Sequence, residues 1–496
     1  MIIFHNKHKA FAFWGAAFVL LAALMFTGCK QSAGGSGSGI GGTVYEAPFV
    51  EGGASLILSP DKLDIKVKAV TSDGNPVTVE GCNETTLAND TETELHATGT
   101  MVILKGKIIE LYCGGYEYNG IYYISRNKLT ALNVQGLSAL QVLSCDYNQL
   151  TALNVQGLND LKELYCYRNQ LTALDVQGLT ALQVLSCGPK LTALDVQSCT
   201  ALQKLHCFGN RLTALDVQGC TALKELYYIG NQITTTLNVQ GCTALRVLLC
   251  HENQLTALNV QGCTALQELN CRNNQLTSLD VQGCTALGGL QCFGNQLTVL
   301  NVQGLTALQY LDCRDNQLTA LNVQGCTALK TLWCWSNQLT ELNVQGLTAL
   351  KELRCGNDQL TALNAQGCTA LEGLGYYGHQ LTELNVQGCT ALKGLWCCSN
   401  RLTALNVQGC TALKSLGCYG NRLNADAFKK LFDDLPQRQD SDEAKCVLYT
   451  EEPGVTEGNH TDFSTPSDLA AAFNNAKTVK KWKMYKRKMN GPGEEI

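Results

Sequence analysis

The stretch LTALNVQGCTALKTLWCWSNQ, residues 318–338, decides the fold because it recurs with few changes along most of the chain. The next stretch, LTELNVQGLTALKELRCGNDQ from residue 339, shows which positions are kept and which vary. A period of about 21 residues means stacked supersecondary units that each contact only their neighbours. The sequence therefore predicts a solenoid. The fifteen repeat starts, which enclose fourteen full units, are Leu129, Leu150, Leu171, Leu191, Leu212, Ile233, Leu255, Leu276, Leu297, Leu318, Leu339, Leu360, Leu381, Leu402 and Leu423.

The second half of each unit has the pattern L-x-x-L-x-C-x-x-N-x-L, as in residues 161–171. Its L-x-C segment alternates as a strand does, so successive units should pair as a parallel sheet with their apolar residues inward. The Asn amide both donates and accepts, so a column of Asn can bond its own turn and a neighbouring unit. The first half, L-T-A-L-N/D-V-Q-G-C/L-T-A-L, is too short and irregular for a helix of three turns. It predicts an extended segment followed by a tight turn at Gly.

This pattern resembles the leucine-rich repeat signature with Cys in the middle Leu position. Within that family it is most similar to the short repeats of bacterial surface proteins called treponemal-type or BspA-like, over roughly residues 102–423. The resemblance implies a leucine-rich repeat solenoid of the α/β-type class, mostly β here. Its curved parallel sheet would form the concave face, with extended segments and tight turns on the convex face and a cap at each end. Members of that group are mostly adhesins or proteins of unknown role, and the resemblance supplies no catalytic residues.

The amino terminus resembles a lipoprotein signal peptide, residues 1–28. Lys7 and Lys9 precede an apolar run over residues 10–26, and Phe-Thr-Gly-Cys at 26–29 resembles a lipobox. We expect lipidation of Cys29; a transmembrane anchor is the alternative. The chain would then be a bacterial outer membrane lipoprotein at the cell surface, contacting the membrane through that lipid.

Composition and patterning divide the rest of the chain into a tether, a solenoid and a cap on each side of the solenoid. Residues 29–43 are mostly Gly and Ser and predict a flexible tether. Residues 44–110 contain alternating stretches that predict an N-terminal β cap, and residues 111–423 form a solenoid of about 14–15 repeats. Residues 424–496 predict a C-terminal α/β cap, with helices over 426–435 and near 469–476, a strand near 446–449 and a last strand around Trp482.

The charge pattern argues against a nucleic-acid partner. The net charge is −5, and only 16% of the residues are charged. A basic segment, residues 477–488, surrounds Trp482 and Tyr485. We expect a solvated terminal strand there rather than a contact with anionic lipid or polysaccharide.

The 26 cysteines follow the repeat rather than a disulfide framework. Thirteen occupy the L-x-C position, and nine occupy the position after the turn Gly, where other units carry Leu. A position that accepts Leu or Cys is apolar, so we expect buried free thiols; disulfides or a metal column are the alternatives. No ligand spacing supports a metal site, and no cofactor is expected. Cys398 occupies an outward position and is the candidate reactive thiol.

The residues that flank each L-x-C vary almost freely between units, whereas the convex positions barely change. Strand alternation points these flanking residues outward, onto the concave face. Exposed Trp, Tyr and Arg carry most of the energy at interface hot spots. The alternative is that the aromatic rings only stack on each other and stabilise an exposed sheet. The candidate ligand-binding residues form a dense group, Phe293, Tyr310, Asp312, Arg314, Trp333, Trp335, Arg354, Tyr377 and Trp396, and a front group, Tyr165, Tyr167, Arg168 and Phe208.

These patterns predict a monomeric, adhesin-like cell-surface protein that recognises a protein ligand of a host or of neighbouring bacteria. A glycan ligand is the nearest alternative, and a structural envelope lipoprotein without a specific ligand is another. No catalytic residues are expected, because nucleophile-elbow, zincin and P-loop motifs are absent from the sequence. Asp358 and His379 replace Asn in adjacent units and could pair, but no nucleophile accompanies them.

Overall fold

The computed structural model describes residues 46–114, 116–118, 121–123, 127–452, 454, 457–488 and 493–496. These residues belong to the unit Tyr45–Ile496. The predicted signal peptide 1–28, the lipidation site Cys29 and the tether 29–43 lie outside the described residues.

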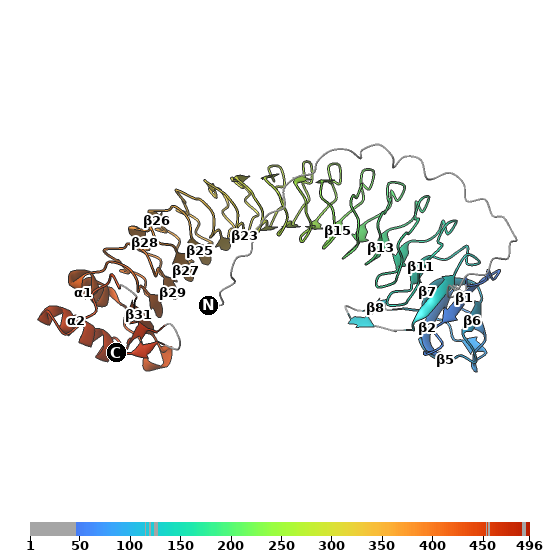
Figure 1. The fold of residues 1–496 in the computed structure, drawn as a ribbon, viewed down its shortest axis with the longest axis horizontal. Coiled ribbons are helices and arrows are strands. Elements are labelled where there is room, and N and C mark those ends of the chain that lie inside the picture. Colours follow the sequence, from blue (N-terminus) through green and yellow to red (C-terminus); the bar gives the residue numbers. More distant parts are fainter. Residues whose placement is uncertain are drawn as a thin grey trace. The chain divides into compact units, whose positions relative to one another are not determined.

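Each repeat contributes one short strand, or rung, from its L-x-x-L-x-C half. The rungs pair in parallel and in chain order, with Leu aligned on Leu in neighbouring rungs, as for Leu143, Leu164 and Leu185. Within the described unit the stack bends, and this sheet lies on the inner side of the bend, the concave face (Figure 1). The predicted leucine-rich repeat solenoid is therefore confirmed. Its rungs are β11 (Val142–Ser144), β12 (Glu163–Tyr165), β13 (Val184–Ser186), β14 (Lys204–His206), β15 (Glu225–Tyr227), β17 (Val247–Leu249), β19 (Glu268–Asn270), β21 (Gly289–Gln291), β23 (Tyr310–Asp312), β24 (Thr331–Trp333), β25 (Glu352–Gly356), β27 (Gly373–Tyr377), β29 (Gly394–Trp396) and β30 (Ser415–Gly417).

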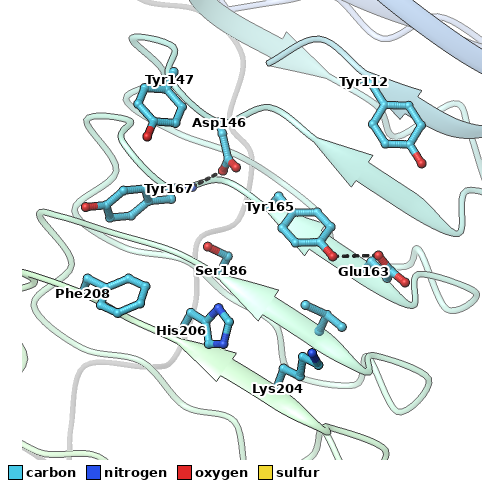
Figure 2. A pocket seen from close by; sticks show the side chains of 11 residues that line it. Tyr112, Asp146, Tyr147, Glu163, Tyr165, Tyr167, Ser186, Lys204, His206 and Phe208 are labelled. Carbon is cyan, nitrogen blue, oxygen red and sulfur yellow. Dashed lines mark hydrogen bonds between the residues drawn. The ribbon is translucent and has the colours of Figure 1, made fainter. Parts of the chain in front are cut away.

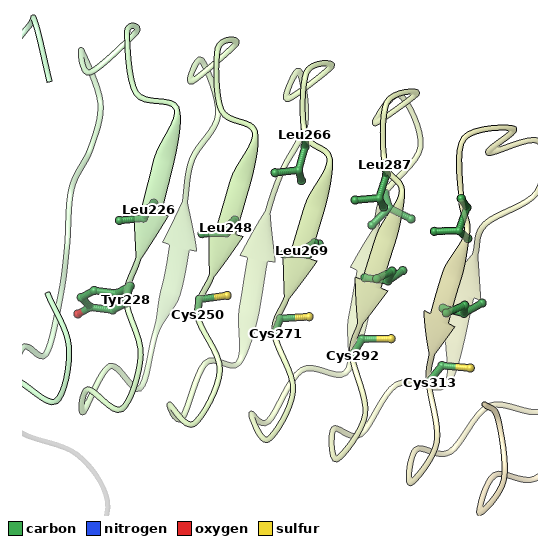
Figure 3. Packing of buried hydrophobic residues seen from close by; sticks show 14 of the residues in the cluster. Leu226, Tyr228, Leu248, Cys250, Leu266, Leu269, Cys271, Leu287, Cys292 and Cys313 are labelled. Atoms are coloured by element: carbon green, nitrogen blue, oxygen red, sulfur yellow. The ribbon is translucent and has the colours of Figure 1, made fainter. Parts of the chain in front are cut away.

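The core consists of columns of Leu, Val and Cys that run along the stack. Leu248 and Cys250 of one rung lie beside Leu269 and Cys271 of the next, and all four are buried (Figure 3). Tyr228 takes the Cys position in another rung and is buried as well. Burying one such Leu stabilises the fold by about 1.5–3 kcal/mol. Because every unit supplies the same apolar positions, one continuous core forms along the repeats.

The Asn column bonds the backbone of adjacent rungs, as predicted. Asn274 Oδ1 accepts from the Leu255 amide at 3.0 Å, and its Nδ2 donates to the carbonyls of Cys271 and Cys250 at 2.9 and 3.1 Å. A buried backbone group without a partner is costly, and this one side chain satisfies three such groups at its turn. Asn459, beyond the last repeat, donates to Cys418 O at 2.9 Å and extends the column.

The first half of each repeat lies on the convex side, and a turn in it explains which residues recur there. Asn322 Oδ1 accepts from the Gln324 amide at 3.0 Å, and the following Gly325 has φ +82°, which favours glycine. Only Asn and Asp occur at this position because each offers the same acceptor two residues before the amide. The Gln324 side chain then donates to Asn343 O of the next unit at 3.0 Å. Short parallel pairs form here between β16 (Thr236–Asn238) and β18 (Ala257–Asn259), β20 (Ser278–Asp280) and β22 (Val299–Asn301), and β26 (Ala362–Asn364) and β28 (Glu383–Asn385).

All twenty-five cysteines in the described part of the chain are free thiols, and all except Cys82 are buried, as predicted. Thiols at the turn position donate to a carbonyl of the preceding unit; Cys326 Sγ lies 3.1 Å from Val302 O. The prediction for Cys398 was wrong. It is 2% exposed, and burial raises the pKa of its thiol to about 12, so the reactive thiolate does not form near neutral pH.

The N-terminal strands close one end of the stack. β7 supplies the first rung, pairing in parallel with β11 and antiparallel with β2. A second sheet, in the order β10-β1-β6-β3-β4, includes the convex strand of the first repeat. A hairpin of β8 (Tyr116–Tyr118) and β9 (Ile121–Tyr123) follows β7. The other strands are β1 (Gly53–Leu58), β2 (Asp64–Thr71), β3 (Val77–Glu80), β4 (Thr86–Leu87), β5 (Thr93–His96), β6 (Met101–Lys105), β7 (Ile108–Tyr112) and β10 (Leu129–Asn133).

The C-terminal residues continue the sheet and then cover it. β31 pairs in parallel with β30, and β32 pairs with β31. The first helix begins after Asn424, whose side chain accepts from the Ala427 amide, and it buries Phe428, Leu431 and Phe432. Trp482 is buried just before β32, with its Nε1 donating to Pro436 O at 2.9 Å. Neither α-helix in the described residues is both long and apolar enough to cross a bilayer. The elements are α1 (Ala425–Asp434), the 3₁₀ turn Asp440–Asp442, β31 (Lys445–Thr450), α2 (Ser467–Thr478), β32 (Lys483–Arg487) and β33 (Glu494–Glu495).

Candidate binding surface on the concave sheet

The outward positions of the rungs form the candidate site, since the residues before and after each core Cys point away from the core. Seven of the predicted ligand-binding residues form one group, called the central cluster below. Its members lie on or next to β21, β23, β24 and β25 and are Phe293, Tyr310, Asp312, Arg314, Trp333, Trp335 and Arg354.

Arg314 is the centre of that cluster. Its guanidinium carbon lies 4.2 Å from the ring centroid of Phe293 and 4.8 Å from that of Trp335, one rung away on either side. Trp333 packs edge-on against Tyr310, with ring centroids 5.6 Å apart, and lies 5.9 Å from Trp335. Cation–π contacts of this kind contribute about 0.5–1 kcal/mol at exposed sites. Stacking therefore holds the cluster in place before any ligand arrives, and its rings remain partly exposed.

Asp312 is the acidic member of the cluster and is only 1% exposed. Burial raises the pKa of its carboxyl to about 6, although the nearby Arg314 guanidinium acts in the opposite direction. Arg314 Nε lies 3.5 Å from Asp312 Oδ1. The carboxylate thus positions the arginine that the aromatic rings enclose.

Tyr377 and Trp396 lie further along the sheet. Trp396 covers Gly417 of the next rung, where an added Cβ would meet its ring at 2.5 Å. Tyr377 is 51% exposed, and its ring lies against Gly375. The sequence predicted one dense group; the structure places Tyr377 one rung and Trp396 two rungs beyond Arg354 of the central cluster, with their rings over Gly375 and Gly417.

The front group lines a hollow of about 350 Å³ in the first rungs, called the front hollow below. Tyr165, Tyr167 and Phe208 line it, as Figure 2 shows. Arg168 instead lies over the outer rings, 5.4 Å from Tyr147 and 5.6 Å from Tyr167. The sequence prediction missed the other lining residues, which are Tyr112, Asp146, Tyr147, Glu163, Val184, Ser186, Lys204 and His206.

The front hollow exists because one rung carries small residues between two rungs that carry large ones. β13 presents Ser186 outward, and Gly188 follows it, whereas β12 and β14 present rings on both sides. This rung belongs to the shortened repeat, which has Gly188-Pro189-Lys190 where other units have x-x-N-Q. The alternation of small and large residues in the outward columns was the available sequence signal.

Rings and carboxylates form the walls of the front hollow. His206 stacks on Tyr227 with centroids 4.2 Å apart and planes 5° apart, and Tyr167 meets Phe208 edge-on at 5.9 Å. Tyr165 donates its hydroxyl proton to Glu163 Oε2 at 2.8 Å, as Figure 2 shows. Burial raises the pKa of the Tyr165 phenol, and the charge of Glu163 and the hydrogen bond to it raise the pKa further.

The basic tail is largely paired with acidic and aromatic groups. Lys486 Nζ lies 2.5 Å from Glu451 Oε2 and 3.4 Å from Glu494 Oε1, and Lys488 also contacts Glu494. Arg487 lies 4.6 Å from the ring centroid of Tyr419 on the concave face. These pairs tie the terminal strand to the solenoid.

The arrangement on the concave face suits binding rather than catalysis. No group of three or more metal-ligating side chains occurs within the described ranges. Asp358 and His379 do not form the pair that the sequence allowed. Asp358 accepts from the backbone amides of Asn337, Leu339 and Gly356, and His379 is exposed.

Known structures share this fold. The functional domain of InlJ from Listeria monocytogenes, which includes a cysteine ladder, is 28% identical, with a TM-score of 0.52 over 75% of this chain and 72% of that one. A leucine-rich repeat protein of Leptospira interrogans is 26% identical, with a TM-score of 0.50 over 62% of this chain and 80% of that one. No protein-family model matches the sequence, and no curated protein matches it either. By fold, the chain is a leucine-rich repeat solenoid similar to those of bacterial leucine-rich repeat proteins.

Proposed function

We propose that this protein is a cell-surface, adhesin-like binding protein that recognises a protein ligand of a host or of neighbouring bacteria on its concave face. One observation carries the proposal: partly exposed Trp, Tyr and Arg side chains gather at outward positions of a sheet whose inward positions hardly vary. Such residues dominate the binding energy at protein interfaces. The central cluster is also held by stacking, which lowers the entropy lost on binding.

The proposal includes attachment and assembly. A lipid on Cys29 would hold the chain at the outer membrane, and the Gly/Ser segment 29–43 would let the solenoid reach outward as a monomer. Globomycin, which blocks lipoprotein signal cleavage, should leave an unprocessed precursor of higher mass. Protease treatment of intact cells should then remove the mature chain if it is exposed at the surface.

Binding can be tested with the full chain in mild detergent on arrays of matrix proteins, bacterial surface proteins and glycans. Replacing Trp333, Trp335 and Trp396 together with Ala should abolish saturable binding to a protein on the array. These side chains lie outside the core columns, so the melting temperature should change little. The matched control replaces three exposed convex residues, Thr319, Thr340 and Thr361, with Ala and should bind normally.

Three other outcomes would contradict the proposal. Binding that survives the triple Trp change would place the interface elsewhere. Saturable binding to glycans alone would favour the glycan-binding alternative. No binding to any protein or glycan would favour a structural envelope lipoprotein.

A further inference from the structure

We infer that the front hollow is a separate subsite that takes the guanidinium group of an arginine side chain on the protein partner. This inference rests on the proposed function, because it names one group of the ligand that the concave face would bind. The shape of the front hollow, the direction of its hydrogen bonds and its charge each support it.

The shape fits a planar group. Tyr165 of β12 and His206 of β14 lie on either side of Ser186, two rungs apart, which is roughly 9.6 Å. His206 is stacked on Tyr227 on its far side, so its other ring face is turned toward β13. Contact on both faces of a flat group takes about 7–8 Å in all. A guanidinium is flat, and it stacks on aromatic faces better than an ammonium does.

Three donors of the lining already have carboxylate partners. Tyr165 already donates to Glu163, and Tyr112 donates to Glu110 Oε2 at 2.8 Å. Lys204 Nζ, the strongest donor in the wall, lies 3.0 Å from Glu225 Oε1. An arginine side chain offers five donors and no acceptor, so it can bond to the Glu163 carboxylate without needing a donor from the wall.

The charge of the front hollow also favours a cation. Glu163 contributes a carboxylate to the lining, and the charge of Lys204 is balanced by Glu225. Another nearby cation, Arg168, is not part of the lining and lies over the rings of Tyr147 and Tyr167. Guanidinium–carboxylate hydrogen bonds are among the strong ones in proteins because both partners are charged. An arginine that enters here would therefore gain stacking and charge-assisted hydrogen bonds together.

The backbone after β13 limits which side chains can occupy this end of the front hollow. Gly188 has φ +131°, and an added Cβ would lie 2.7 Å from Phe208 O, so a larger residue cannot fill that end of the rung. Ser186, the other small residue of the same rung, is the position where the front hollow can be blocked by substitution.

The test uses the full chain in detergent and three probes: acetyl-Gly-Arg-Gly-amide, its citrulline analogue and cellobiose. Citrulline keeps the planar shape and removes the charge. Titration followed by NMR or calorimetry should show the arginine peptide binding at least about tenfold more tightly than the citrulline peptide, since one charge-assisted hydrogen bond is worth that factor. Glu163→Gln should remove most of this preference, and Ser186→Phe should abolish binding of the arginine peptide.

The matched control is Glu268→Gln, which removes the same charge from the same column at β19, outside the front hollow. It should bind the arginine peptide as the parent chain does, and near-ultraviolet circular dichroism should show all variants folded. Equal binding of arginine and citrulline, binding of cellobiose alone, or no effect of Glu163→Gln would overturn the inference. Suppose that the parent chain binds a protein on the array, that the triple Trp variant loses this binding, and that the parent chain does not bind the arginine peptide. In that case this inference fails and the proposed function stands.

Discussion

At the scale of single residues, Asp358 shows what the Asn column requires. Its carboxylate accepts from the amides of Asn337 and Leu339 at 3.0 and 3.4 Å, as an Asn oxygen would. An ionised carboxylate has no proton to donate, whereas Asn337 donates to the carbonyls of Cys313 and Cys334 at 3.1 and 2.9 Å. Burial raises the pKa of Asp358 to about 6, because the charged form loses its hydration. The substitution therefore preserves the acceptor and loses the donor.

Replacing Asp358 with Asn should stabilise the protein at neutral pH. With a folded-state pKa above the unfolded value of 3.8, the aspartate favours folding fully only below pH 4, and this stabilisation is lost as pH rises through about 6. The gain from Asp358→Asn should thus be small at pH 4 and reach about 1–3 kcal/mol at pH 7. Urea unfolding at both pH values measures it. Asn337→Asp should show the opposite change, and a gain independent of pH would contradict this account.

A second residue-scale prediction concerns the thiols. Burial raises the pKa of Cys398 to about 12, and the pKa of the less buried Cys82 to about 11. The thiolate is the reactive species, so the native chain should react slowly with iodoacetamide at pH 7.5 at every described cysteine. Mass spectrometry of peptides labelled with and without urea would count the sites. Fast native labelling of Cys398 would support the exposed, reactive thiol that the repeat pattern suggested.

At the scale of elements, the regular units were predictable and the ends were less so. The L-x-C alternation predicted the rungs, and Phe428 and Leu431 at helical spacing predicted α1. The sequence did not reveal that β31 and β32 extend the parallel sheet, because neither segment carries the repeat pattern. The sequence also predicted a solvated strand around Trp482, whereas the indole of Trp482 is buried and donates a hydrogen bond to Pro436 O. Contacts between segments distant in sequence decide such positions.

The C-terminal cap should unfold locally when its aromatic core is damaged. Phe432 is fully buried, with ring centroids 5.6, 5.6 and 5.4 Å from Phe428, Phe463 and Phe473. Phe432→Ala should cost about 3–5 kcal/mol in the cap. Because solenoid units contact only their neighbours, hydrogen exchange should accelerate at β30 and β31 and remain slow at β13.

The matched control for the cap is Phe49→Ala, the same substitution at a side chain that is 62% exposed. It should leave exchange unchanged in every rung. Acceleration spread evenly from β11 to β30 in the Phe432 variant would mean that the solenoid unfolds as one cooperative unit.

At the scale of the whole molecule, the sequence predicted which face carries the variable residues but not how they group. Phe293, Arg314 and Trp335 could be placed in neighbouring outward positions from the repeat alone, and the structure brings them together. The front hollow depends instead on where small side chains fall between large ones, and on the close approach of Gly188 to Phe208. Ring orientation and free volume are three-dimensional properties, so the sequence named only three of the eleven lining residues.

Because the central cluster and the front hollow lie on one sheet, a single protein partner should contact both. Ser186 and Trp335 lie seven rungs apart along the sheet, roughly 34 Å, so substitutions there do not share neighbours. Ser186→Phe and Trp335→Ala should each weaken binding of the protein partner. In the double variant the two losses of binding free energy should add to within about 0.5 kcal/mol. Surface plasmon resonance with the four variants of the cycle measures this. A double variant no weaker than Trp335→Ala alone would show that the partner contacts the central cluster without reaching the front hollow.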